Sequence, residues 1–199
     1  MPERSATSDP RLALRRELRA RRRAIPAAER IAAAERLADR LLALSGLPAH
    51  GPVAGYWAVD GEIGLHAWQL RLPAACTYCL PVLREDGRLR FAPWRPGAPL
   101  LANRHGIPEP DVADDALLEP EAMALVVAPL VAFDARRHRL GMGAGWYDRS
   151  FAFRHERAAP PALVGAAFAM QQVDALDAAA WDVPLDAVCT ELDTFSATD

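Results

Sequence analysis

Arg139-Leu140-Gly141-Met142-Gly143-Ala144-Gly145-Trp146-Tyr147-Asp148 is the stretch from which the rest of the chain can be interpreted. An apolar segment, 124–133, precedes it, and residues 147–155 can form a helix after it. The local order is therefore strand, glycine-rich turn, helix. Three glycines at alternate positions leave one side of the backbone bare and allow φ > 0 without steric cost. Such a loop can direct several N–H groups at one anion, and the start of the following helix adds its dipole.

A phosphate is the anion that this loop is expected to bind, although a plain tight turn beside a helix would show the same glycine repeat. Arg139 and Arg149 flank the loop and can pair with the same oxygens. Asp134 and Asp148 lie beside them. These charged neighbours favour the phosphate over the plain turn.

The composition excludes several classes of protein. All 23 basic residues of the 199-residue chain are arginine, which excludes Walker-type phosphate loops and lysine nucleophiles. Three cysteines argue against a disulfide framework, and a net charge of −3 gives no reason to expect nucleic acid. No apolar run approaches the ~20 residues of a membrane span, and no signal core is visible. We expect a cytoplasmic protein that binds neither nucleic acid nor membrane.

One domain is expected, with residues 1–9 as a disordered tail and 10–195 as a single α/β domain that begins with helices. Short apolar strands are predicted at 53–59, 76–83, 89–94, 124–133, 163–168 and 187–190. The first helix carries arginines four residues apart, at positions Arg11, Arg15 and Arg19. This arginine ridge is either a solvated helix face or a source of guanidinium groups for a polyphosphate.

Glu62 follows the predicted strand 53–59 and is predicted to open a helix with an inner face of Ile63, Ala67 and Leu70. Its carboxylate either complements the helix dipole or belongs to a ligand site, because ligands bind beyond the carboxyl ends of strands in open α/β sheets. The glycine loop with nearby carboxylates describes a nucleoside triphosphate with Mg²⁺, for which Asp134, Asp148 and Asp182 are candidates. We find no convincing nucleophile, and Cys76 and Cys79 are interpreted as core thiols on opposite faces of a strand.

Several stretches in the right order resemble the 5-formyltetrahydrofolate cyclo-ligase family, over nearly all of 10–191. They are Arg11-Leu12-Ala13-Leu14-Arg15, Glu62, Gly106-Ile107-Pro108-Glu109-Pro110, Pro129 to Asp134, Arg139 to Arg149, and Asp182-Val183-Pro184-Leu185-Asp186 leading into Thr190-Glu191. Any one of these stretches would be weak, but together they are specific.

The resemblance implies a Rossmann-like, open three-layer α/β fold with a mostly parallel sheet and helices on both faces. It implies ATP- and Mg²⁺-dependent conversion of 5-formyltetrahydrofolate to 5,10-methenyltetrahydrofolate. We separately expect a monomer, because the sequence shows no exposed heptad pattern and no long apolar edge. The implied ATP-binding residues are Arg11, Arg15, Arg137, Arg139, Leu140, Gly141, Met142, Gly143, Ala144, Gly145, Trp146 and Tyr147. Trp57 and Glu62 would bind folate, Asp148 and Asp182 would bind magnesium, and Glu62, Arg139 and Tyr147 would be catalytic.

Two other functions remain open at this point: a regulatory paralogue that binds ATP or folate without turnover, and a sugar-phosphate or CoA-type enzyme on a similar scaffold. The chain also departs from the family pattern, with Arg11 in place of a usual Lys and Arg137 where many members have Gly. If φ is positive at Ala144, its Cβ should cost about 1 kcal/mol and loosen the loop.

Overall fold

The structure is a computed structural model that describes residues 9–197, and it is organised around a seven-stranded sheet of order β11-β10-β9-β6-β1-β2-β3. The strands are β1 (Gly51–Ala54), β2 (Cys76–Leu83), β3 (Leu89–Pro93), β6 (Leu125–Pro129), β9 (Ala162–Ala166), β10 (Ala187–Cys189) and β11 (Thr194–Ser196). The five inner strands run parallel, and β3 and β11 pair antiparallel at the edges. The predicted open, mostly parallel sheet is confirmed.

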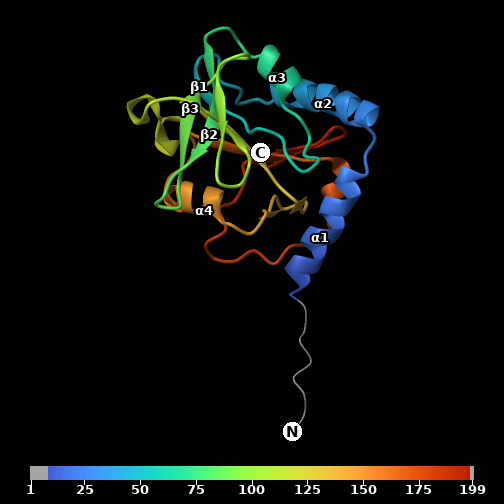
Figure 1. The fold of residues 1–199 in the computed structure, drawn as a ribbon. Coiled ribbons are helices and arrows are strands. Elements are labelled where there is room, and N and C mark those ends of the chain that lie inside the picture. The colour runs from blue at the N-terminus through green and yellow to red at the C-terminus, as the bar shows by residue number, and fades with distance from the viewer. Residues whose placement is uncertain (1–8, 198–199) are drawn as a thin grey trace.

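Helices cover both faces of this sheet, so the predicted three-layer arrangement is also confirmed (Figure 1). On one face, α2 (Ala27–Leu42) and α3 (His66–Leu70) bury Leu37 and Trp68 against the strands. On the other, α4 (Trp146–Ser150) and a 3₁₀ segment, Ala152–His155, enclose Phe151. In the part of the chain that the structure describes, no helix is long and apolar enough to cross a bilayer.

The two cysteines of β2 lie on opposite faces, as their spacing predicts. Cys76 packs against the core beneath α2, whereas Cys79 is fully buried in the core on the other side. Both are free thiols, and burial raises the pKa of the Cys79 thiol to about 12. The interpretation as core thiols therefore agrees with their positions.

Helix α1 (Pro10–Arg23) packs on a small hairpin and not on the main sheet. The hairpin consists of β7 (Ala132–Phe133) and β8 (Arg139–Leu140), and Leu140 belongs with Leu18 of α1 to one apolar cluster. Asp9, predicted to end the tail, instead caps α1 by accepting a hydrogen bond from the Arg11 N–H at 2.9 Å. The remainder of the predicted tail, residues 1–8, lies outside the described residues.

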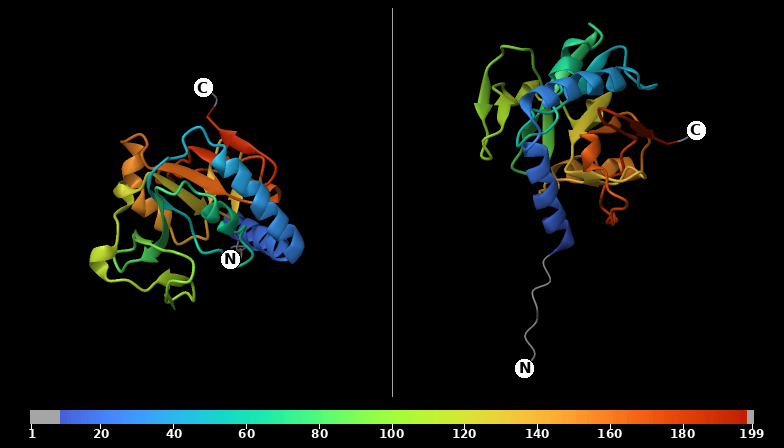
Figure 2. Two further views of the ribbon diagram at one scale, coloured as in Figure 1. Left: turned by 90° about the horizontal axis from the view of Figure 1, so that it is seen from above. Right: turned by 90° about the vertical axis from the view of Figure 1, so that its right-hand side faces the viewer.

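The segment 95–122, which is rich in proline and glycine, has regular structure. It contains the hairpin of β4 (Leu100–Ala102) and β5 (Pro108–Pro110), followed by 3₁₀ turns at Asp114–Ala116 and Pro120–Ala122. The hairpin stands out from the rest of the molecule (Figure 2). The Glu109 carboxylate fastens it to β2, because it accepts hydrogen bonds from the Leu83 N–H and the Asn103 amide.

The predicted strand 53–59 was too long, and the predicted helix start at Glu62 was wrong. The chain leaves the sheet at Gly55, where the Tyr78 phenol occupies the space that a Cβ would need. Asp60 and Gly61 then take left-handed backbone angles, with φ of 53° and 76°, so the chain turns back before it can form a helix. Helix α3 begins only at His66, and its buried side chain is Trp68, while the predicted inner residue Leu70 is exposed.

The predicted strand 124–133 is divided, because β6 ends at Pro129 and β7 pairs in the separate hairpin. The apolar run 124–133 therefore contains β6 of the main sheet and β7 of the hairpin that leads into the glycine loop.

Candidate active site

The crevice between β1 and β6 is the point at which the sheet reverses its order. β1 pairs in parallel with β2 on one side and with β6 on the other, so the chain leaves neighbouring strands in opposite directions. Open α/β sheets bind ligands at such switch points, beyond the carboxyl ends of the strands. Trp57 and Glu62 follow β1, and the chain after β6 continues through the small hairpin into the glycine loop. Both predicted subsites therefore lie at one edge of the sheet.

Glu62 is held in a buried turn. Its Oε2 accepts a hydrogen bond from the Val59 N–H at 3.0 Å, and its Oε1 lies 3.6 Å from a terminal nitrogen of Arg22. Burial raises the pKa of Glu62, although the Val59 N–H and the Arg22 charge oppose the shift. A role at a helix N-terminus is excluded because α3 starts at His66. Trp57, the other predicted folate residue, meets Trp94 edge to face with ring centroids 5.7 Å apart.

A cluster of charged groups at Asp60, which the sequence did not reveal, supports the Glu62 turn. The Asp60 carboxylate accepts hydrogen bonds from Arg19 at 2.7 Å, Arg22 at 2.9 Å and Arg23 at 3.0 Å. Arg22 is fully buried and also donates to the carbonyls of Asp60 and Leu130, which joins the segments that follow β1 and β6. Burial alone would raise the pKa of Asp60, but the Arg19 and Arg22 hydrogen bonds outweigh it and lower that pKa.

The glycine loop has positive φ at Gly143, 101°, and at Gly145, 67°, but not at Ala144. The expected cost of a Cβ at Ala144 is therefore absent. Arg15 donates from Nε to the Gly141 carbonyl at 2.9 Å, and its guanidinium also lies over the bare side of Gly143. Helix α4 has only five residues, so the dipole predicted to assist the loop contributes little here.

Other predicted ATP-binding residues surround this loop. Leu140 is buried against α1, whereas Met142 is 48% exposed. The guanidinium groups of Arg104 and Arg149 lie 5.4 and 5.3 Å from the Trp146 ring centroid. Arg137, at φ 67°, donates to the Leu185 carbonyl at 3.2 Å. Its side chain is thus used to join the small hairpin to the segment before β10.

The predicted metal ligands meet at the loop formed by residues 177–183. Asp148 Oδ1 accepts hydrogen bonds from Arg139 at 2.5 Å and from the Val183 N–H at 3.1 Å. Asp182, the residue before Val183, accepts from the Ala179 N–H at 2.8 Å, and its Oδ2 lies 3.5 Å from Arg11. The structure therefore brings both carboxylates to one place between α1 and α4.

Asp134, the third carboxylate considered for magnesium, has a structural role instead. It is fully buried and accepts backbone hydrogen bonds from Arg136, His138 and Leu176. Burial would raise its pKa, but these N–H donors and the His138 ring together lower it. The carboxylate stabilises the turn between β7 and β8, and so the strand that enters the glycine loop.

Two of the predicted catalytic side chains, Arg139 and Tyr147, lie beside each other. The Arg139 guanidinium, 7% exposed, lies 5.8 Å from the centroid of the Tyr147 ring. Burial raises the pKa of Tyr147, and the Glu62 charge adds to the increase. Arg15 of α1 contacts the glycine loop and Arg22 of the same helix contacts Glu62, so one helix links the two predicted subsites.

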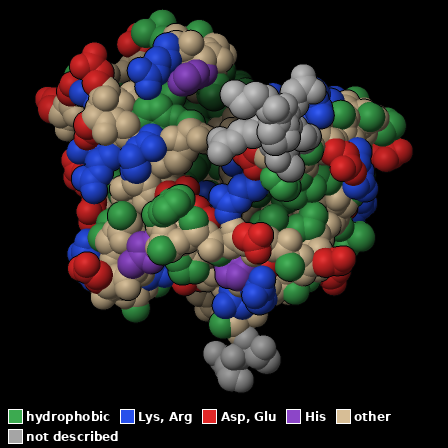
Figure 3. All heavy atoms as spheres, turned by 90° about the horizontal axis from the view of Figure 1, so that it is seen from below, with side chains coloured by type: hydrophobic (Ala, Val, Ile, Leu, Met, Phe, Trp, Pro, Cys, Tyr) green, Lys and Arg blue, Asp and Glu red, His purple; other side chains and the backbone are tan. Residues whose placement is uncertain are grey.

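A cavity of about 410 Å³ opens beside the glycine loop. It is lined by Gly143, Ala144, Gly145, Asp148, Arg149, Ala152, His155 and Trp181. Seen from below, this side of the molecule is hollowed and bears basic side chains near the hollow (Figure 3). The size suits a small-molecule ligand.

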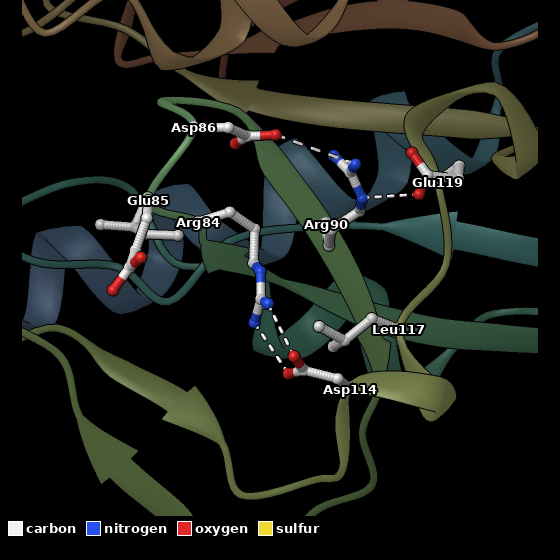
Figure 4. Close-up of a pocket in the computed structure, with 8 residues that line it drawn as sticks. Arg84, Glu85, Asp86, Arg90, Asp114, Leu117 and Glu119 are labelled. Carbon is white, nitrogen blue, oxygen red and sulfur yellow. Dashed lines mark hydrogen bonds and ion pairs between the residues drawn. The ribbon is translucent and has the colours of Figure 1, made fainter.

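A larger cavity, of about 660 Å³, lies at the β2–β3 turn (Figure 4). Its charged side chains already pair with one another, Arg84 with Asp114 and Arg90 with Glu119, each at 2.7 Å. None of the predicted site residues lines it. The candidate site is therefore the smaller cavity together with the adjoining crevice.

Arginines of α1 hold the segments of this site together. Arg11 contacts the 177–183 loop, Arg15 the glycine loop, and Arg19 the turn after β1. The arginine ridge is thus not a solvated helix face. The signals in the sequence were the four-residue spacing of the arginines and the Asp-Gly turn at a strand end, but neither indicated their pairing.

The chain matches known proteins over most of its length. The model of a family described as the 5-formyltetrahydrofolate cyclo-ligase family matches residues 7–191. The chain is 33% identical over 177 residues to 5-formyltetrahydrofolate cyclo-ligase of Escherichia coli K12, covering 87% of this chain and 96% of the relative. It is 37% identical over 137 residues to the protein of that name from Haemophilus influenzae, covering 67% and 72%.

Solved structures show the same fold. The NMR structure of 5,10-methenyltetrahydrofolate synthetase from Aquifex aeolicus superposes with a TM-score of 0.79 at 27% identity, covering 95% of this chain and 93% of that one. A 5,10-methenyltetrahydrofolate synthetase from Mycoplasma pneumoniae superposes with a TM-score of 0.70 at 22% identity, covering 92% and 99%. The likeness therefore extends over almost the whole chain.

Proposed function

Because the chain belongs to the 5-formyltetrahydrofolate cyclo-ligase family, we propose that it converts 5-formyltetrahydrofolate to 5,10-methenyltetrahydrofolate with ATP and Mg²⁺, releasing ADP and phosphate. The observation that carries this proposal is the double attachment of α1. Arg15 of this helix contacts the glycine loop, and Arg22 contacts the turn that holds Glu62. A nucleotide on the loop and a folate at Glu62 would then be neighbours on one rigid support.

The chemistry proposed for the site is phosphoryl transfer followed by ring closure. The formyl oxygen attacks the γ-phosphorus, an O–P bond forms, and the bond to the β-phosphate oxygen breaks to release ADP. N10 of the same folate then attacks the formyl carbon and loses its proton to water, and the C–O bond breaks to release phosphate. Such transfer depends on positioning and charge stabilisation, which suits a site without a protein nucleophile.

The side chains of the site have distinct tasks in this proposal. Bare backbone at Gly143 and Gly145 lets phosphate oxygens approach N–H groups, and Arg15 and Arg139 supply positive charge beside them. Tyr147 stays protonated because burial raises its pKa, so its hydroxyl can donate to an oxygen that gains charge. Glu62 orients the folate ring by accepting hydrogen bonds from its N–H groups.

Asp148 and Asp182 fit a magnesium ion by the chemistry of their donors. Each is 20% exposed, and each has one carboxylate oxygen without a hydrogen bond to any residue from 9 to 197. Mg²⁺ takes only one or two protein carboxylates and completes its shell with phosphate and water. That agrees with the lack, within the described residues, of a cluster of three or more His, Cys, Asp or Glu. Bound there, the ion would neutralise the phosphate charge.

The decisive experiment mixes the protein with 5-formyltetrahydrofolate, ATP and Mg²⁺ and follows methenyl absorbance and ADP together. The proposal expects both products in equal amounts, with each substrate required. Binding of ATP and folate without either product would favour the regulatory alternative. ADP release that does not depend on folate would contradict the proposal. We also propose that the protein is a monomer, which light scattering can test.

A further inference from the structure

Trp181 is the most exposed large apolar side chain of the described residues, at 72%, and it lines the cavity beside the glycine loop. The same cavity is also lined by Gly143, Gly145 and Asp148, which are the proposed phosphate and magnesium positions. His155 completes the wall. The indole ring and the glycine backbone therefore line one cavity.

The loop that carries Trp181 is fastened on both sides of the indole. On the N-terminal side, Arg11 donates a hydrogen bond to the Asp177 carbonyl. On the C-terminal side, the Asp182 carboxylate accepts from the Ala179 N–H, and the Val183 N–H donates to Asp148. These contacts hold the backbone of a surface loop, while the indole itself remains open to solvent. An exposed aromatic ring on a fixed backbone can stack against a flat ligand.

We propose that Trp181 is the platform on which the purine base of the nucleotide stacks, an inference that rests on the proposed ATP-dependent function. A polyphosphate on the glycine loop places its attached nucleoside in the same cavity. Trp57 and Glu62 do not line that cavity, so the folate ring is not the group that Trp181 meets. Stacking of a base on an aromatic side chain stabilises binding whatever the base's hydrogen-bonding edge. The site should therefore select a nucleoside triphosphate over a bare polyphosphate more strongly than it selects among purines.

The test compares ATP with inorganic tripolyphosphate, each with Mg²⁺, by calorimetric titration of the wild type, Trp181→Ala and Trp181→Phe. Trp181→Ala should weaken ATP binding roughly tenfold to a hundredfold and leave tripolyphosphate binding within about twofold, because only ATP carries a base. Trp181→Phe should restore most of the ATP affinity. Leu70→Ala is the matched control, since Leu70 is an exposed apolar residue on α3, which lies on the opposite face of the sheet.

Each other outcome counts against the inference in a recognisable way. Equal loss of ATP and tripolyphosphate would mean that Trp181 holds the loop and not the base. Unchanged ATP binding in Trp181→Ala, or weaker binding of 5-formyltetrahydrofolate instead, would also overturn it. If the wild type binds neither ATP nor tripolyphosphate, the proposed function itself fails, and the inference fails with it.

Discussion

Replacing Asp60 by asparagine tests the idea that the arginines of α1 are organised by one carboxylate. The asparagine side chain would keep an oxygen acceptor but remove the negative charge that Arg19, Arg22 and Arg23 share. Arg22 is fully buried, and removing the partner of a buried charge costs about 3–5 kcal/mol. Asp60 is 16% exposed, and Arg22 keeps two carbonyl acceptors and Glu62. We therefore expect a loss of about 2 kcal/mol, below that range.

For a chain of this length, that loss corresponds to a fall in Tm of about 4–8 °C. The measurement is urea unfolding at pH 7 and at lower pH, compared between the wild type and Asp60→Asn. Asp114→Asn is the control, because the Asp114 carboxylate also pairs with an arginine, Arg84, but on the exposed surface. It should have little effect on the free energy of unfolding.

The effect of Asp60→Asn should depend on pH in a definite direction. The folded-state pKa of Asp60 is lowered from 3.8, so its charge stabilises the fold above that value. The contribution is lost as pH falls through the folded-state pKa. The wild type should therefore be more stable than Asp60→Asn by the full amount at pH 7, and this gap in the free energy of unfolding should narrow towards pH 3. A gap that is negligible at pH 7, or that is the same at both, would refute the reasoning.

Three further predictions concern the candidate site. Glu62→Gln should lower kcat/KM for 5-formyltetrahydrofolate by tenfold or more and leave ATP affinity within about twofold, because only folate is proposed to meet Glu62; equal loss of both would contradict that role. Gly143→Ala should lower the free energy of unfolding by about 1 kcal/mol and weaken ATP binding, because φ is 101° at this position. Ala144→Gly should not improve ATP binding, because φ is not positive there. Thermal unfolding and ATP titrations can check both. Asp182→Asn should raise the Mg²⁺ concentration for half-maximal rate roughly tenfold at saturating ATP; an unchanged Mg²⁺ requirement would remove it from the proposed metal site.

Much of the fold could be predicted because its determinants are local. The strand Cys76–Leu83 and the returning strand are set by short apolar runs with turn residues between them, and the structure has both, although β3 ends at Pro93, one residue before the predicted end. The failures lie where distant contacts decide. The chain leaves the sheet at Gly55 because Tyr78 approaches it, and no pattern near Gly55 records that ring. Helix α3 starts late because the left-handed backbone angles at Asp60 and Gly61 first turn the chain back.

The candidate site was predictable in its parts but not in its assembly. The glycine loop, Glu62, Asp148 and Asp182 each stand out by residue type and by position after a strand or loop. The salt bridges of Asp60 with α1 join residues about forty positions apart, and periodicity within a helix cannot reveal which distant group it faces. The sequence therefore suggested residues for ligand contact, which stay predictions, and did not reveal the contacts that hold those residues in place.

The chain contains no lysine, and at Arg22 the structure uses a property that lysine lacks. Its Nε donates to the Asp60 carbonyl, one terminal nitrogen to the Leu130 carbonyl and the other to the Asp60 carboxylate. Three acceptors in different directions are joined because the guanidinium is planar and rigid, whereas an ammonium group is a compact point charge on a flexible stem. The crevice at the switch point thus depends on the shape of an arginine and not only on its charge. The same helix carries Arg15 to the glycine loop, so the geometry of the two proposed subsites is set by one element.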